Sequence, residues 1–285
     1  MKQKSKLTSF SLLFLAAALL VVLIYTLFFD IPASYSATQE TGIFTSAEPA
    51  TAPASVTPPT PAEDLARQQI AAFARKHSID PSEYPESLIL LLSRNSEAAD
   101  FVLNYPLEKD LAHTVDMTEY ENGSGVPLFL QWDRRWGYIP YGNDVAGING
   151  CGPVCLSMAA YYLTGDAEMS PDKIIEFAKA EGYCTEEDGS TWTLVSEGAG
   201  KLGLEAVELP LSYDRIAANL EVNNPIICVV GPGDFTSSGH FIVLTGMEDG
   251  KLRVNDPNSV ANSQALWDYD TLYGQILNLW ALRTP

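Results

Sequence analysis

The chain has 285 residues, of which 46% are hydrophobic, and it carries a formal net charge of −19 at pH 7. This length allows one core of about 150–200 residues together with accessory segments. Binding to nucleic acid or to an anionic lipid surface requires clustered Lys and Arg side chains. The acidic balance therefore argues against both classes of partner.

The first 30 residues have the pattern of a membrane anchor. Residues 7–29 contain no charged side chain, and three lysines precede them. About 20 helical residues cross a hydrocarbon core of about 30 Å, and the flanking lysines stay in the cytoplasm. We therefore predict a cytoplasmic tail at 1–6, a transmembrane anchor at 7–29 and a single-pass protein of the cell membrane whose remainder is extracytoplasmic. The alternative is a signal peptide, whose cleavage would make the same domain secreted.

Two segments separate this anchor from the main domain. Residues 30–62 are rich in Ala, Thr, Ser and Pro, a composition that buries little apolar surface, so we predict a disordered linker. Apolar side chains then recur at helical spacing after Pro61, after Pro85 and from Ser96. We predict a helical accessory segment over 63–118. It can be either a cap on the following domain or a stalk without functional contacts.

Residues 119–285 are predicted to form an α+β domain. A helix is expected from Cys151 to Leu163, ended by Gly165, and a second helix after Ser170. Compact apolar strands are expected later, at 225–230 and in a hairpin of 240–247 with 251–255. Because the helices come first and the strands follow, the pattern favours α+β over a doubly wound sheet.

Cys151 is the candidate nucleophile. Glycines lie on both sides of it, and Pro153 suits the first turn of a helix. The free N–H groups and the dipole at a helix N-terminus favour an anion, which lowers the pKa of a thiol. Cys155, one turn later, should point into the core. Of the other cysteines, Cys184 and Cys228 are the pair that a disulfide could join, because the domain is expected outside the cell.

The candidate general base is a histidine, and the chain has three. His77 and His113 lie in polar segments and are expected on the surface. His240 follows Gly239 and opens a predicted strand, so its imidazole can face a cleft. The orienting acceptor should come from the opposite strand of the hairpin: a three-residue turn at 248–250 brings Asp256 to His240, whereas a two-residue turn brings Asn255 instead.

These residues resemble a known family. The resemblance rests on Val126-Pro127, Gln131-Trp132-Asp133, Gly150-Cys151-Gly152-Pro153, Gly239-His240-Phe241 and Val254-Asn255-Asp256-Pro257. Together they resemble the C39-like cysteine peptidases (peptidase C39_2) of the papain-like clan, as found in secreted or membrane-anchored proteins of Gram-positive bacteria. The resemblance implies a papain-like fold with Cys151 as nucleophile, His240 as base and Asp256 as its orienting partner. It also suggests Gln131 as the oxyanion donor, although twenty residues separate it from Cys151.

The expected function is thiol-dependent hydrolysis of peptide bonds, without a cofactor or metal. The expected partner is a peptide or protein substrate, which includes cell-wall peptides, and the protein is expected to be a monomer. Three other functions remain possible from the sequence. The same residues could serve a cell-wall amidase or endopeptidase, or an acyl transferase, and the domain could be a non-catalytic surface binding module. A zinc site is disfavoured because Cys184 and Cys228 lack the paired spacing of zinc ligands.

Overall fold

The computed structural model describes residues 58–121, 123–186 and 189–285. The predicted tail and anchor at 1–29, and the linker up to residue 57, lie outside this part of the chain. Within the part that is described, no helix combines the length and the hydropathy that a bilayer span requires. The predicted anchor at 7–29 therefore stays a prediction.

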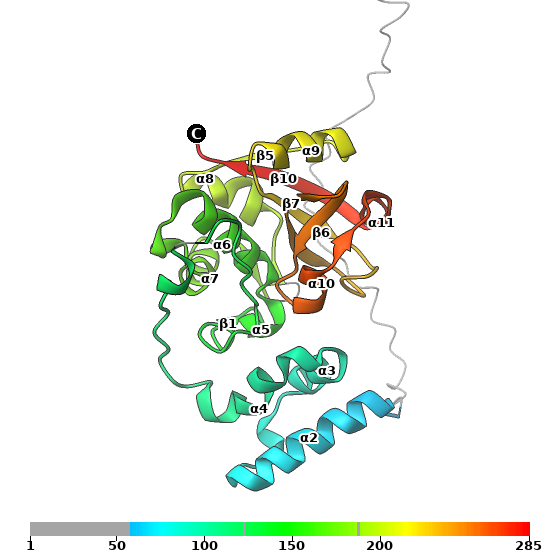
Figure 1. Ribbon diagram of the computed structural model, residues 1–285. Coiled ribbons are helices and arrows are strands. Elements are labelled where there is room, and N and C mark those ends of the chain that lie inside the picture. Colours follow the sequence, from blue (N-terminus) through cyan, green and yellow to red (C-terminus); the bar gives the residue numbers. More distant parts are fainter. Residues whose placement is uncertain (1–57, 122, 187–188) are drawn as a thin grey trace, which may run out of the picture. The chain divides into compact units, whose positions relative to one another are not determined.

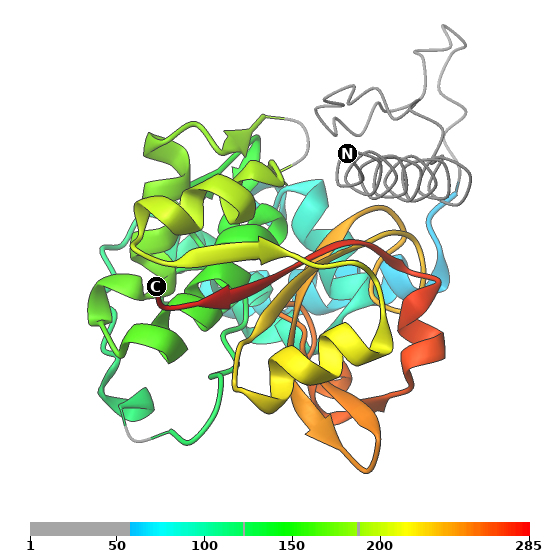
Figure 2. The same ribbon diagram turned by 90° about the horizontal axis from the view of Figure 1, so that it is seen from above.

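The centre of the fold is a six-stranded antiparallel sheet with the order β5-β10-β6-β7-β8-β9. Its strands are β5 (Glu205–Glu208), β6 (Ile226–Val230), β7 (His240–Glu248), β8 (Lys251–Asn255), β9 (Leu266–Trp267) and β10 (Ile276–Arg283). The strands expected at 225–230, 240–247 and 251–255 are confirmed as β6, β7 and β8. Strand β10, which no sequence pattern predicted, lies between β5 and β6 and beside β5 in Figure 2.

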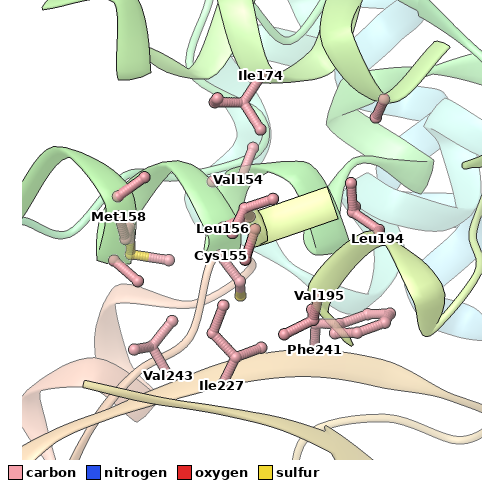
Figure 3. Close-up of a cluster of buried hydrophobic side chains, with 14 of the residues drawn as sticks. Val154, Cys155, Leu156, Met158, Ile174, Leu194, Val195, Ile227, Phe241 and Val243 are labelled. Atoms are coloured by element: carbon pink, nitrogen blue, oxygen red, sulfur yellow. The ribbon is translucent and has the colours of Figure 1, made fainter. Parts of the chain in front are cut away.

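Helices cover both faces of this sheet, as the alternation along β6 shows. Ile227 and Val229 belong to the core cluster beneath helices α6 (Cys151–Thr164) and α7 (Pro171–Ala180). Cys228 and its neighbours on the other face belong to a second cluster with α9 (Tyr213–Glu221) and α11 (Tyr269–Tyr273). In Figure 3, Cys155 projects from α6 toward the strands. The α+β class is thus confirmed as helices packed on an antiparallel sheet.

Shorter elements connect these layers. They are η3 (Thr118–Tyr120), β1 (Pro140–Tyr141), β2 (Asp144–Val145), α5 (Ala146–Asn149), η4 (Ala167–Met169), β3 (Cys184–Thr185), β4 (Gly189–Ser190), η5 (Leu194–Gly198), α8 (Ala199–Lys201) and α10 (Val260–Gln264). Two of them matter for the site. Helix α5 leads directly into α6, and α10 follows the end of β8.

The accessory segment is helical and packs on the α+β body (Figure 1). It consists of α2 (Pro61–His77), η1 (Pro81–Glu83), α3 (Glu86–Arg94), η2 (Ser96–Ala98) and α4 (Ala99–Glu108). Its core cluster includes Tyr138 and Val145 of the body. The Tyr138 hydroxyl donates to the Phe101 carbonyl oxygen at 2.8 Å, and the Arg134 guanidinium pairs with Asp100 at 2.6 Å. These helices therefore form a cap on the domain rather than a stalk without contacts.

The Phe101 ring fits against Gly147 so closely that the glycine has no room for a side chain. A Cβ atom on Gly147 would lie 2.3 Å from the ring, which is fully buried and stacked on Tyr138. We expect Gly147→Ala to destabilise the protein by about 1–3 kcal/mol, because the ring or the backbone must move. Urea unfolding measures this. The matched variant Gly200→Ala, which meets nothing within 4 Å, should not lower stability; equal stability of the two variants would contradict the packing argument.

Candidate active site

Cys151 is the first residue of α6 and is partly exposed, whereas the next residues of the helix are buried. Gly152 is required beside it, since a Cβ atom there would lie 2.6 Å from the Ser190 hydroxyl oxygen. Ser190 is in turn bonded to the Tyr141 hydroxyl at 2.7 Å. The predicted position of the thiol, at a helix start between two glycines, is confirmed.

The charge state of the Cys151 thiol is set by its neighbours. Burial raises the pKa of this thiol, but a hydrogen bond to His240, the charge of the imidazolium and the N–H groups of Phe241 and Gly152 outweigh burial, so the net pKa lies below the usual value. A lowered pKa favours the thiolate at neutral pH, which is the nucleophilic form.

The other three cysteines behave differently. Burial raises the pKa of Cys155, Cys184 and Cys228, which keeps these thiols protonated and unreactive. All three are free thiols. The suggested Cys184–Cys228 disulfide is therefore wrong: Cys184 packs beside the α6 core, whereas Cys228 points into the cluster on the opposite face of the sheet.

His240 is the first residue of β7 and is only 8% exposed. Its Nε2 lies 2.8 Å from Asp256 Oδ1, which leaves Nδ1 as the ring nitrogen for the thiol. Burial lowers the pKa of His240, but the hydrogen bonds to Asp256 and Cys151 and their negative charges raise it above the usual value. The pKa of Cys151 is thus lowered and the pKa of His240 is raised, and this combination favours a thiolate–imidazolium pair.

The Asp256 carboxylate is 1% exposed and has three hydrogen-bond donors. Oδ1 accepts from the His240 ring and from the Asn258 backbone N–H, both at 2.8 Å. Oδ2 accepts from the Asn262 side-chain amide at 2.8 Å. Sequence reasoning did not identify Asn258 or Asn262, because neither belongs to a recognisable motif. The carboxylate is fixed by the loop that follows it.

The turn of the hairpin differs from the expected one. It has two residues, Asp249 and Gly250, with φ of 50° and 79°, and Glu248 lies opposite Lys251. The predicted three-residue turn is therefore wrong. An Asp-Gly pair adopts these two positive φ values readily, and their twist matches that of the flanking strands.

The register is nevertheless the one that brings Asp256 to the histidine. A β-bulge between Leu244 and Gly246 shifts the pairing by one residue, so that Val243 lies opposite Asn255. The Asn255 amide instead donates to the carbonyl oxygens of Val126 and Pro127, at 3.1 and 2.9 Å. Of the two residues left open by the sequence, Asp256 is the one bonded to His240.

Gln131 lies on the wall of the same cleft as Cys151. Its Nε2 donates to the carbonyl oxygens of Gly147 and Ile148, both at 3.0 Å, and its Oε1 has no hydrogen-bond partner within the described residues. The backbone N–H of Gln131 donates to the Pro257 carbonyl oxygen at 2.7 Å. The glutamine therefore approaches the site despite its distance in sequence, and its oxyanion role stays a prediction.

The two other histidines are exposed and lie outside the cleft. His77 stacks on Phe73 at a centroid distance of 4.1 Å, and the His113 ring lies 3.3 Å from the Glu108 carbonyl oxygen. Neither is among the residues that line the cleft with Cys151. Their predicted surface positions are confirmed.

A cleft of about 1310 Å³ opens at Cys151, His240 and Asp256. One wall is the 233–241 segment before and at the start of β7. The other wall comes from the accessory helices, in residues 87–97. The cleft is thus larger than the roughly 300–1,000 Å³ that is usual for small-molecule pockets.

No match was found among the curated proteins. Among solved structures, the peptidase domain of Streptococcus ComA, a bi-functional ABC transporter of a quorum-sensing pathway, is 20% identical with a TM-score of 0.40, over 56% of this chain and 99% of that one. A Bacillus anthracis protein described as C39-like is 16% identical with a TM-score of 0.33, over 57% and 95%.

The family comparison covers more than half of the chain. A model of the family described as "Peptidase_C39 like family" matches residues 124–284, which contain Gln131, Cys151, His240 and Asp256. This range includes the whole six-stranded sheet and helix α6. The chain belongs to the Peptidase_C39 like family.

Proposed function

We propose that the protein is a thiol-dependent peptidase with a papain-like catalytic domain, in which Cys151, His240 and Asp256 act together. The observation that carries the proposal is the Cys151 thiol, whose pKa is lowered beside a histidine that is itself hydrogen-bonded to a buried carboxylate. Among the four cysteines, only Cys151 has this shift. A nucleophile, a base and an orienting acceptor in contact are the components that acyl transfer requires.

The proposed reaction has two stages. The Cys151 thiolate attacks the carbonyl carbon of the scissile amide, and the imidazolium of His240 gives its proton to the leaving nitrogen as the C–N bond breaks. The acyl group then remains on sulfur as a thioester. Neutral His240 next removes a proton from water, which attacks the thioester, and the released thiolate regenerates the ion pair with His240.

The oxyanion needs hydrogen-bond donors near the thiol. Backbone N–H groups at the start of α6 are suited to this, because a helix N-terminus favours negative charge. The Gln131 amide is the candidate second donor. Its Nε2 would have to exchange one of its bonds to Gly147 or Ile148 for the substrate oxygen.

The setting of the enzyme is also part of the proposal. The uncharged run at 7–29 supports a single membrane anchor with the catalytic domain outside the cell, and the acidic composition favours protein or peptide substrates, which include cell-wall peptides, over nucleic acid. A monomer suffices, since every residue invoked in the reaction comes from one chain.

Thiol labelling tests the proposal. We expect iodoacetamide at pH 6 to modify Cys151 of the full-length chain well before Cys184, because only Cys151 has a lowered pKa. Peptide mapping by mass spectrometry identifies the modified residue. In parallel, peptide mixtures should be cleaved by the parent and not by Cys151→Ala. Preferential labelling of another cysteine, or equal cleavage by both proteins, would refute the assignment.

A further inference from the structure

The accessory helices contact the loop that follows Asp256. The contacting residues are Asn95 and Glu97, in the turn between α3 and α4, which we name the 95–97 turn. The Glu97 carboxylate accepts the backbone N–H groups of Val260 and Ala261, at 2.8 and 3.0 Å. These are the first N–H groups of α10, which otherwise lack partners in the helix. The Asn95 side-chain amide donates to the Asn258 carbonyl oxygen at 2.5 Å.

The residues held in this way belong to the loop that fixes Asp256. The Asn258 backbone N–H and the Asn262 amide are the two loop donors to the Asp256 carboxylate. The 95–97 turn therefore bonds to the Asn258 carbonyl oxygen and to the first N–H groups of α10, in the same short segment whose other groups donate to Asp256. Asn95 itself is oriented, because its Oδ1 accepts the Glu97 N–H at 2.9 Å while its Nδ2 reaches Asn258.

We propose that the 95–97 turn positions Asp256, so that the accessory helices are a working part of the active site. Asn95 and Glu97 act through the 257–262 loop and are positioning residues, not catalytic ones. The turn precedes the family-matched region, 124–284, and it also lines the cleft beside Cys151. The inference rests on the proposed function, since it assigns the turn a role in activating the Cys151 thiol.

The expected effect of changing Glu97 on Cys151 follows from the negative charge that Asp256 places beside His240. Glutamine at position 97 keeps one acceptor oxygen but replaces the other by an NH₂ group, so one of the two N–H groups of Val260 and Ala261 loses its acceptor, and the loop holds the Asp256 carboxylate less firmly against the His240 ring. The imidazolium is then less stabilised, so its pKa falls. The Cys151 thiolate loses part of the positive charge beside it, and its pKa rises. The acid limb of Cys151 reactivity should therefore move to higher pH.

Glu97→Gln in the full chain tests this, with the rate of Cys151 alkylation by iodoacetamide measured from pH 4 to pH 9. We expect the acid limb to move upward by about 0.5–1 pH unit, so that the rate at pH 6 falls by about 3- to 10-fold. The matched control is Asp100→Asn, which removes the same charge from the same helices and weakens their ion pair to Arg134. It should follow the parent profile.

Two further variants separate positioning from a general loss of packing. Val260→Pro removes one N–H that Glu97 accepts, and proline is well tolerated at the first position of a helix; it should shift the profile in the same direction, by less. In an Asp256→Asn background, Glu97→Gln should add nothing, because both changes act on one interaction. Thermal unfolding of each variant checks that the fold persists.

The outcomes are distinct. Profiles of Glu97→Gln and Val260→Pro that coincide with the parent would overturn the inference, as would a full additive shift in the Asp256→Asn background. An equal shift in Asp100→Asn would show that undocking of the helices, not the 95–97 turn, is responsible. In all three cases a reactive Cys151 leaves the proposed function standing. A parent protein without a preferentially reactive Cys151 would remove the proposed function, and this inference with it.

Discussion

Replacement of His240 by alanine is expected to slow alkylation of Cys151 at pH 7 by at least about 30-fold, since a thiol with an unperturbed pKa near 8.5 has only a few per cent thiolate at that pH. Burial raises the pKa of Cys151 once the imidazolium is gone, so the loss should exceed this lower limit. Peptide hydrolysis should fall further, by about 10³-fold or more, because the leaving amine also loses its proton donor.

The control for this variant is His113→Ala, which removes an exposed histidine outside the cleft. Its Cys151 reactivity and peptidase activity should equal those of the parent. Cys184, a partly exposed thiol without a histidine partner, provides an internal reference, and its labelling rate should be the same in all three proteins. If His240→Ala retains the parent's Cys151 reactivity, His240 is not the base.

Asp256→Asn is expected to lower the rate of peptide hydrolysis at neutral pH by about 10- to 100-fold. The reason is that a hydrogen bond to an ionised group contributes about 1.5–3 kcal/mol. The asparagine can keep the geometry, since its carbonyl oxygen can accept from His240 and Asn258 in place of Oδ1, and the Asn262 amide can rotate to accept from its NH₂ group. The variant therefore removes the negative charge with little change in shape.

The pH dependence gives the sign of this effect. In the parent, activity should fall on the acid side as the Cys151 thiolate is protonated and on the alkaline side as the His240 imidazolium is deprotonated. Loss of the Asp256 charge should move the acid limb up and the alkaline limb down, which narrows the active range. The control is Asp268→Asn, which removes an exposed carboxylate paired with Lys251. An unchanged profile in Asp256→Asn would contradict an electrostatic role for this carboxylate.

The sequence was sufficient to predict the local setting of the site where short-range rules apply. Cys151 lies between glycines and before a proline, a combination typical of a helix start. His240 opens a strand for equally local reasons, and the strands at 225–230 and 240–255 are compact apolar runs between turn residues. Strand β10 also follows a glycine, Gly274, but Asn278 interrupts its apolar run. Its alternation is interrupted by an irregular register between Ile276 and Asn278, so tertiary pairing determines it.

The register of the hairpin shows where local rules fail. The Asp-Gly turn alone predicts that Asn255 faces His240, and the bulge beside Thr245 reverses this. A bulge depends on packing across several strands, which the sequence of one hairpin does not contain. The contact of Glu97 is even harder to predict from the sequence, because Glu97 lies 163 residues before Val260, whose N–H it accepts. A glutamate in a polar turn gives no sign of such a contact.

This separation along the chain has a consequence for the folding protein. Contacts between distant parts of the sequence bring together the 95–97 turn, Cys151 and the 257–262 loop that follows Asp256. Such contacts form slowly, because long loops must close first. Until then Cys151 has no imidazolium beside it, and its thiol titrates like that of an unfolded peptide, near pH 8.5. If Cys151 is the nucleophile, as proposed, a nascent or partly folded chain is expected to be protected from premature alkylation and from attack on its own backbone, and reactivity of the thiol is expected to mark the completed fold.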